Sequence, residues 1–284
     1  MTVTAHHQGL PHLPAAITRP LRLRPRATLT LVVASVAGLA AFGWPLLVRP
    51  GAALDSTSAP LVFALLLPLV VGVVVAEVFE GGLDAKALAM LGVLSAIGAA
   101  LRPLGPGTAG LETVFFLLVL GGRVFGPGFG FVLGTTTLFA SALLTGGVGP
   151  WLPFQMLGAA WVGLGAGLLP RVRGKAELAL LAVYSAVASL LYGAALNLSF
   201  WPFALGERTQ LSFDAAAGTL ENLHTFALFT LATSLGFDLG RAITTVVLVL
   251  VTGPAVLAAL RRAARRAAFD APAEFEPAAD DGRR

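Results

Sequence analysis

Residues 121–171 read GGRVFGPGFGFVLGTTTLFASALLTGGVGPWLPFQMLGAAWVGLGAGLLPR and hold two apolar runs, each long enough to cross a bilayer. A Gly-Pro turn opens each run, at Gly126-Pro127 and at Gly149-Pro150. The second run also carries Trp151 and Gln155, one helical turn apart. Lipid tails offer polar groups no partner, so such residues at the mouth of a membrane helix face a ligand, a pore or the headgroups.

The composition places the whole chain in the membrane. Apolar residues make up 56% of the 284 residues, charged residues only 12%, and the mean hydropathy is +0.83. A soluble chain has roughly 25% charged residues. The chain has no cysteine, which excludes disulfides, thiolate metal sites and cysteine nucleophiles. The sequence therefore predicts an all-α polytopic integral membrane protein.

Eight apolar segments have lengths suited to membrane spans. They are Thr28–Val48, Pro60–Phe79, Ala85–Leu101, Ala109–Val124, Gly126–Gly146, Trp151–Leu169, Glu177–Phe200 and Leu239–Leu260. The fourth is the weakest, because its apolar run is short and ends at Gly121-Gly122. A ninth segment, Leu220–Phe237, is apolar but has a polar first turn, which favours an interfacial or re-entrant helix in an outer loop over a full span.

The distribution of basic residues supports eight spans with both termini in the cytoplasm. Basic residues favour the cytoplasmic side of short loops. In this topology only Arg49, Arg102, Arg208 and Arg241 of the 19 basic residues lie outside. A ninth span would put the cluster Arg261–Arg266 outside. We therefore expect a multi-pass plasma-membrane protein with cytoplasmic termini.

The chain divides into four parts by composition. They are a disordered basic tail (1–27), two extra spans (28–80), a six-span core (83–266) and a disordered acidic tail (267–284). Three of the four histidines lie in the first tail without a regular ligand spacing, so we expect no metal site there.

Motifs for catalysis are missing from the sequence. It contains no HExxH, no GxSxG and no P-loop, so we expect neither an enzyme nor a bound cofactor. Glu77, Glu80 and Glu112 lie near the ends of spans and not at a membrane centre, where a proton-coupled carrier needs an ionisable group. If the chain moves a solute, a partner must supply the energy.

Four features together resemble the substrate-specific (S) components of energy-coupling factor (ECF) vitamin transporters, and most of all the actinobacterial-type members. They are an alanine-rich helix ending in Arg-Pro (87–103), the turn FGPGFG (125–130), the helix start GPWLPFQM (149–156), and a last helix that begins FDLGR (237–241) and ends in a basic run (253–266). The resemblance covers Leu83 to Arg266 and leaves the first two spans outside the family pattern.

The resemblance implies a six-span membrane component with both termini inside. It also implies partners, namely a transmembrane coupling subunit and two ATPases that drive uptake of a vitamin or related micronutrient. Cobalamin is the first candidate ligand, because the pattern is closest to cobalamin-type or unassigned S components. Riboflavin, thiamine and a queuosine precursor remain open.

The resemblance further implies a partner face of small residues on the first core helix. In the family, alanines spaced AxxxA dock the coupling subunit, and residues four apart share one helix face. The small residues with this spacing are Ala85, Ala89, Gly92, Ala96 and Ala100. The alternative is that they pack against the protein's own helices.

A ligand pocket is implied near the outer ends of the later core helices. The candidate substrate-binding residues are Trp151, Gln155, Asn197, Tyr192, Glu112 and Trp201. The three aromatic residues have an alternative as part of an aromatic belt, and the two amides as interhelical hydrogen bonds. Asp238 and Arg241, three apart at a helix start, are expected to form a cap and an ion pair.

Two rival functions remain open on the sequence alone. The extra spans and tails also suit a membrane scaffold or assembly factor. An intramembrane enzyme acting on prenyl lipids is disfavoured, because no aspartate cluster suits metal-bound pyrophosphate.

Overall fold

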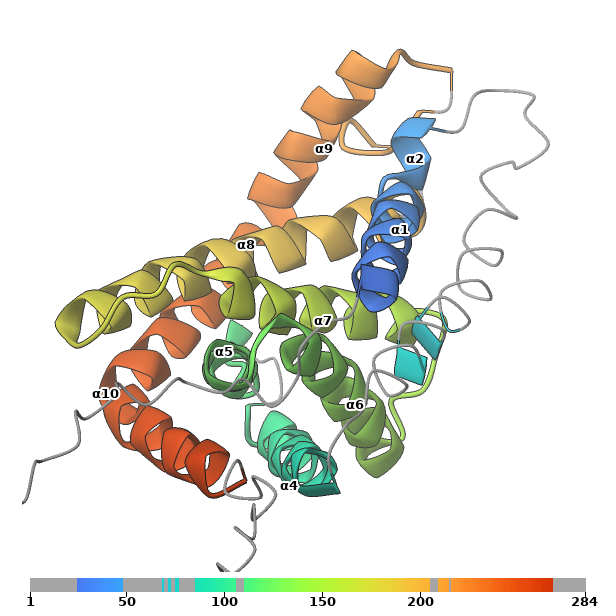
Figure 1. Cartoon of the computed structure of the whole chain (residues 1–284). Helices are drawn as coiled ribbons and strands as arrows, with labels where there is room; N and C mark the ends of the chain where they lie inside the picture. Colours follow the sequence, from blue (N-terminus) through green and yellow to red (C-terminus); the bar gives the residue numbers. More distant parts are fainter. Residues whose placement is uncertain are drawn as a thin grey trace, which may run out of the picture.

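The protein is described by a computed structural model over residues 25–47, 85–105, 110–204, 209–214 and 216–267, and at positions 68, 71, 72, 75 and 76. The regular elements of these residues are all helical (Figure 1). They are α1 (Pro25–Phe42), α2 (Trp44–Leu47), α4 (Ala85–Leu101), the 3-10 turn η1 (Arg102–Leu104), α5 (Phe115–Phe125), α6 (Pro127–Thr145), α7 (Leu152–Leu168), α8 (Lys175–Ala204), α9 (Thr219–Thr233) and α10 (Leu235–Ala267). The expected all-α polytopic bundle is confirmed.

Five described helices are long and apolar enough to cross a membrane, namely α1, α4 with η1, α6, α8 and α10. The apolar helices α5 and α7 are shorter. Most of the expected second span (Pro60–Phe79) lies outside the described residues, as do nearly all residues of both tails. At 11 residues α5 is about 16 Å long, which is half of a bilayer core. Nine of its residues are buried, so α5 is the centre of the bundle.

Glycines bring the backbones of α5, α6 and α7 into direct contact. A Cβ atom at Gly130 of α6 would collide with the carbonyl group of Gly163 in α7 and lie 2.9 Å from the Cα of Gly122 in α5. Between α5 and α6 the chain turns at Gly126, whose φ of 100° suits only glycine well. The glycines of the 121–171 stretch thus set the spacing of the three central helices.

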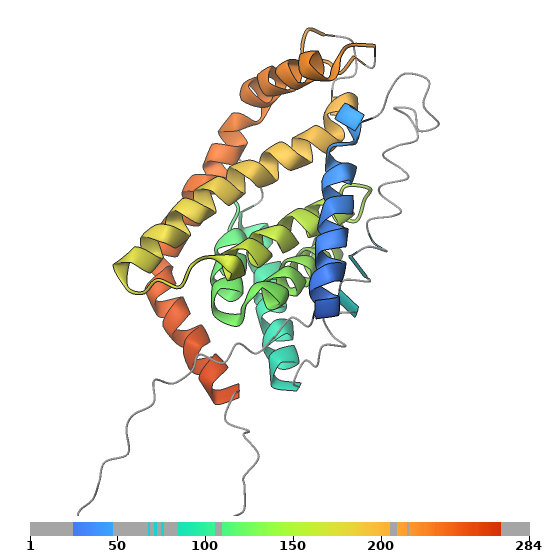
Figure 2. The same ribbon diagram turned by 45° about the horizontal axis from the view of Figure 1, so that its top comes forward.

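The first helix is built onto the core. The indole nitrogen of Trp161 in α7 donates a hydrogen bond to Ser35 Oγ of α1 at 3.0 Å. Phe42 packs edge-on against Phe154 with ring centroids 5.2 Å apart, and Gly38 leaves the space that Leu157 and the Trp161 ring occupy. Figures 1 and 2 both show α1 beside α7 and the end of α8, away from α10.

The break between α1 and α2 places a tryptophan against the end of α8. Trp44 is fully buried, stacks on Phe203, and donates its indole hydrogen to the Ser199 carbonyl at 2.9 Å. Pro45 follows at once, in the short helix α2. The α1–α2 segment therefore packs against both α7 and α8 and links these two helices.

A charged network joins the ends of α5, α8 and α10. Glu177 Oε1 lies 2.7 Å from Arg123 Nε and 2.6 Å from an Arg261 nitrogen. The Arg123 guanidinium also donates to the carbonyls of residues 169, 170 and 172 at 2.9–3.1 Å. We call Arg123, Glu177 and Arg261 the Glu177 network.

The polar segment expected in an outer loop forms α9, which stands away from the bundle (Figure 2). It has 15 residues, is not among the helices long enough to cross a membrane, and is separated from α10 by Ser234. Leu220 and Leu231 are 80% and 59% exposed. α9 contacts α2, α8 and α10 only lightly.

Candidate functional site

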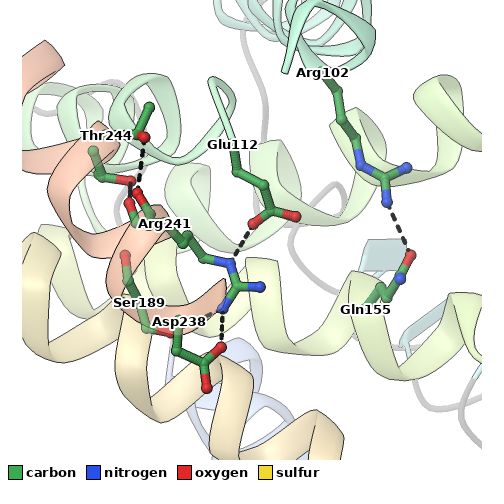
Figure 3. A network of polar contacts seen from close by, with 9 residues as sticks. Arg102, Glu112, Gln155, Ser189, Asp238, Arg241 and Thr244 are labelled. Carbon is green, nitrogen blue, oxygen red and sulfur yellow. Dashed lines mark hydrogen bonds and ion pairs between the residues drawn. The ribbon is translucent and has the colours of Figure 1, made fainter. Parts of the chain in front are cut away.

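A buried arginine at the start of α10 joins two carboxylates from distant parts of the chain. The Arg241 Nε donates to Glu112, in the segment before α5, and one terminal nitrogen donates to Asp238 Oδ1 at 2.6 Å. The same nitrogen lies 3.3 Å from the Ser189 carbonyl of α8 (Figure 3). The side chains of these three charged residues are 6–17% exposed. We call Glu112, Asp238 and Arg241 the Arg241 cluster.

Aromatic rings form one wall of the Arg241 cluster. The guanidinium carbon lies 5.1 Å from the ring centroid of Tyr192 and 5.8 Å from that of Phe115, which is within cation–π range. The two rings meet edge-on at 4.8 Å. Next to Tyr192, Gly193 makes room for the Asp238 carboxylate, because a Cβ atom there would collide with it. The buried positive charge of Arg241 is therefore stabilised by the two carboxylates and by the faces of the two aromatic rings.

A second arginine lies close to the cluster and is paired differently. A terminal nitrogen of Arg102, at the end of α4, donates to the Gln155 side-chain oxygen of α7 at 3.2 Å (Figure 3). Thr113 Oγ1 donates to the Leu101 carbonyl at 2.6 Å. This bond joins the residue next to Glu112 to the residue next to Arg102. The Arg102–Gln155 pair and the Arg241 cluster are therefore adjacent.

Four of the predicted substrate-binding residues belong to this region. Glu112 and Tyr192 are part of the cluster or its wall, and Gln155 is the partner of Arg102. Trp151, 47% exposed, immediately precedes α7, and its carbonyl accepts a hydrogen bond from the backbone N–H of Gln155 at 3.0 Å. The tryptophan and the glutamine thus share the first turn of the helix, as their spacing predicts.

Asn197 lies further along α8. It follows Gly193 by one helical turn, so the two share a face of the helix. Its side-chain nitrogen is buried and has no hydrogen-bond partner. A buried unpartnered donor is rare in folded proteins and is expected where a water or a ligand completes the site.

Trp201 is the predicted residue that the structure does not bring to the cluster. It is 1% exposed and packs against Phe213, Phe226 and Phe229. Its indole nitrogen donates to the Leu211 carbonyl at 2.7 Å. These contacts hold the segment before α9 against the end of α8.

Three residues of the site are not among the candidate substrate-binding residues of the sequence, namely Arg102, Arg241 and Ser189. The sequence places Arg102 on the side of the expected pocket and predicts a local ion pair for Arg241, and no motif points to Ser189. The Arg241–Asp238 ion pair is confirmed at 2.6 Å. The partnership of Arg241 with Glu112 joins positions 129 apart, which no local spacing indicates.

The predicted small-residue face of α4 lies open in the described part of the chain. Ala85, Ala89, Gly92, Ala96 and Ala100 are all exposed, and a Cβ atom at Gly92 would meet nothing within 4 Å. The opposite face of α4 is buried, and the helix packs mainly on α6. Among the described residues, no helix of the protein covers this face.

These features define a class of protein: a multi-pass helical membrane protein with a charged and aromatic site near the ends of its helices. Residues 86–253, more than half of the chain, match the family described as ECF transporter, substrate-specific component. The chain therefore belongs to this family, as the resemblance predicts. No curated protein and no solved structure matches the chain. The family match begins at α4, so α1 and α2 lie outside it.

Proposed function

We propose that the chain is the substrate-binding subunit of an ECF-type importer that captures a vitamin or related micronutrient at the outer face of the membrane. The family is that of a transporter's binding component and not of an enzyme. The single observation that carries the proposal is the match of residues 86–253 to this family. The Arg102–Gln155 pair beside the Arg241 cluster is our candidate for the binding site, because ionisable groups are expensive in a membrane protein and often mark substrate pathways.

The charges at the end of the bundle opposite the Arg241 cluster support an outward-facing binding site. The Glu177 network lies beside Arg171, Arg173 and Lys175, and the run Arg261–Arg266 completes a basic surface. Basic residues favour the cytoplasm. The Arg241 cluster, at the other end of α10, then faces outside, with both termini of the chain in the cytoplasm.

The side chains around the cluster suit a ligand with a planar, hydrogen-bonding group. Trp151 offers a half-exposed stacking surface, and the amides of Gln155 and Asn197 offer donors and an acceptor. Tyr192 and Glu112 would form the inner wall of the binding site. Trp201 would act indirectly, by holding the segment before α9.

Cobalamin is our first candidate for the ligand, on the strength of the sequence pattern. A ligand of that size requires a wide outer vestibule. The segment from Phe200 to Phe237, including the projecting helix α9, would provide a lid over it. Riboflavin, thiamine and a queuosine precursor are the other candidates.

The open face of α4 is our candidate for the contact with the coupling subunit. Small side chains allow two helix backbones to approach closely, and this face is exposed. We expect Ala96→Trp and Ala100→Trp to abolish co-purification with the coupling subunit. Leu39→Trp adds bulk to an exposed position of α1 and is the matched control. An unchanged complex in the α4 variants would remove this face from the proposal.

The function is tested by co-expressing the full chain with a coupling subunit and an ATPase pair and by native mass spectrometry of the purified complex. We expect a four-component assembly with a bound vitamin and ATP-dependent uptake. A chain that purifies without ATPases and with only lipid bound would instead favour a membrane scaffold.

A further inference from the structure

The two arginines of the site differ in how many of their donors are engaged. Arg241 donates to two carboxylates and a carbonyl. A guanidinium has five N–H donors, yet among the described residues Arg102 donates to a single partner, the neutral amide oxygen of Gln155. Its remaining donors are not among the buried unpartnered atoms, so they are accessible. Arg102 is thus the arginine of the site that can take up a further group.

The amide of Gln155 increases this donor capacity. Its oxygen accepts from Arg102, and its nitrogen has two N–H groups that donate to no other residue in the described part of the chain. This nitrogen is not buried, so it is also accessible. The pair therefore presents several accessible donors side by side and no accessible anion of its own.

The position of Arg102 is fixed by the fold. The Thr113–Leu101 hydrogen bond holds the end of α4 against the segment before α5. Gly105 packs so closely on the Leu111 backbone that a Cβ atom would lie 3.1 Å from its carbonyl carbon and nearer still to the oxygen. Figure 3 shows the Arg102 side chain directed towards α7. A long side chain that only reached for lipid headgroups would need no such support.

The neighbouring charges limit what can bind. The Arg241 cluster has a formal charge of −1, from two carboxylates and one guanidinium, and Arg102 brings the site to zero. An anion therefore has to bind at Arg102 and Gln155, on the side away from the carboxylates. A charged donor forms shorter and stronger hydrogen bonds with carboxylate or phosphate oxygens than with neutral acceptors.

We propose that the transported solute carries an anionic carboxylate or phosphate group and that Arg102 and Gln155 bind this group. The inference rests on the proposed function, since it names the chemical class of the ligand at the same site. Arg102 supplies charge and paired N–H donors, and Gln155 adds its amide nitrogen. Arg241 remains a structural counter-ion of Glu112 and Asp238.

Ligand pairs that differ in one anionic group test the proposal. The purified full-length protein in phosphatidylcholine nanodiscs is titrated with riboflavin 5′-phosphate against riboflavin, thiamine monophosphate against thiamine, and nicotinate against nicotinamide. We expect the member with the anionic group to bind at least about 10-fold more tightly than its partner in one of these pairs, a difference of about 1.4 kcal/mol. Equal or tighter binding of the members that lack the anionic group, or no binding by any member that has it, would overturn the proposal.

Two substitutions locate the anion. Arg102→Gln removes the charge, and Gln155→Glu introduces a carboxylate that would pair with Arg102 and repel an anion. Both should abolish the preference for the ligand with the anionic group, while binding of the ligand that lacks this group persists. Arg173→Gln, an exposed arginine on the Glu177 side, is the control and should change nothing. Because Gln155→Glu keeps the shape of the side chain, it tests the idea even if Arg102→Gln does not fold.

The headgroup of an anionic lipid is the competing source of the same chemistry. The titration in zwitterionic phosphatidylcholine is therefore repeated in nanodiscs that also contain anionic phosphatidylglycerol. An unchanged affinity supports a solute site, whereas loss of the anion preference would assign Arg102 to a headgroup and overturn the proposal. If an uncharged vitamin binds and is imported with the coupling subunit, the anion inference fails while the transport function stands.

Discussion

The Glu177 network lies at one end of the bundle, and the Arg241 cluster with the Arg102–Gln155 pair lies at the other. The two regions differ in how many hydrogen-bond partners their arginines have. Along α10 the 20 residues from Arg241 to Arg261 correspond to about 30 Å. In the Glu177 network one carboxylate serves two arginines, and Arg123 has four acceptors. At the other end Arg241 is equally well engaged, but Arg102 beside it is not.

This difference in hydrogen-bond partners distinguishes arginines that stabilise the fold from an arginine whose free donors can bind a ligand. A buried charge is tolerated when its hydrogen-bonding groups are satisfied, and removing one partner is then strongly destabilising. An arginine whose only partner is a neutral amide contributes little to the fold, so its substitution should change binding more than stability. The substitutions below are designed to test this distinction.

The largest effect is expected from Glu177→Gln. The substitution leaves Arg123, whose side chain is 6% exposed, without a counter-ion. Breaking a buried pair in this way costs about 3–5 kcal/mol. We expect a large loss of thermal stability, measured by fluorescence-detected size exclusion of the heated protein. Glu221→Gln, at an exposed position of α9, is the control, and equal stabilities would show that the network is not structural.

A smaller effect is expected from Arg241→Met, because this cluster is somewhat more exposed. Hydrogen bonds to charged groups contribute about 1.5–3 kcal/mol. The variant also leaves Glu112 and Asp238 near each other without the cation between them. Adding Glu112→Gln should recover part of the loss, since it removes one of the two unpaired charges. A double-mutant cycle of unfolding measures this coupling, and simple additivity would refute it.

A third prediction concerns substitutions that should weaken ligand binding and leave the stability of the fold nearly unchanged. Trp151→Ala and Gln155→Ala should each weaken ligand binding about 10-fold, or about 1.4 kcal/mol, with little change in unfolding. The matched comparison is Trp201→Phe, which removes the indole donor to Leu211 and keeps an aromatic ring in place. It should lower stability by about 1 kcal/mol and change affinity far less than the two α7 variants. Titration and unfolding of the same preparations separate the two outcomes. Unaltered affinity in both α7 variants would exclude them from the site.

Much of the fold could be predicted because it depends on local features. Gly126-Pro127 and Gly149-Pro150 do lie at the starts of α6 and α7. The segment 220–237 does form a helix separate from α10, although it ends at Thr233 and its last three residues belong to α10. The weak fourth segment is the short central helix α5. Its burial could not be predicted, since apolar side chains look the same whether they face lipid or other helices.

The site was predictable only in part, for a related reason. Spacing placed Trp151 and Gln155 on one turn and Asp238 near Arg241. The pairs Arg241–Glu112 and Arg102–Gln155 join positions 129 and 53 apart, and depend on how whole helices pack. The same holds for α1, whose contacts with α7 lie outside the family match and follow no motif.

The smallest effect is expected away from both charged assemblies, at the contact of α1 with α7. Ser35→Ala removes the acceptor of the Trp161 indole while the ring keeps its place against Gly38 and Phe42. A neutral hydrogen bond contributes about 1 kcal/mol, so a modest loss of stability should appear with ligand binding unchanged. Gly38→Leu, which would collide with the Trp161 ring, should destabilise far more and shows whether α1 is seated there at all. If both variants unfold like the wild type, α1 does not pack on the core as described. If Ser35→Ala instead weakens binding, the first helix contributes to the site, and the contrast between structural and ligand-binding groups would extend beyond the two arginine assemblies.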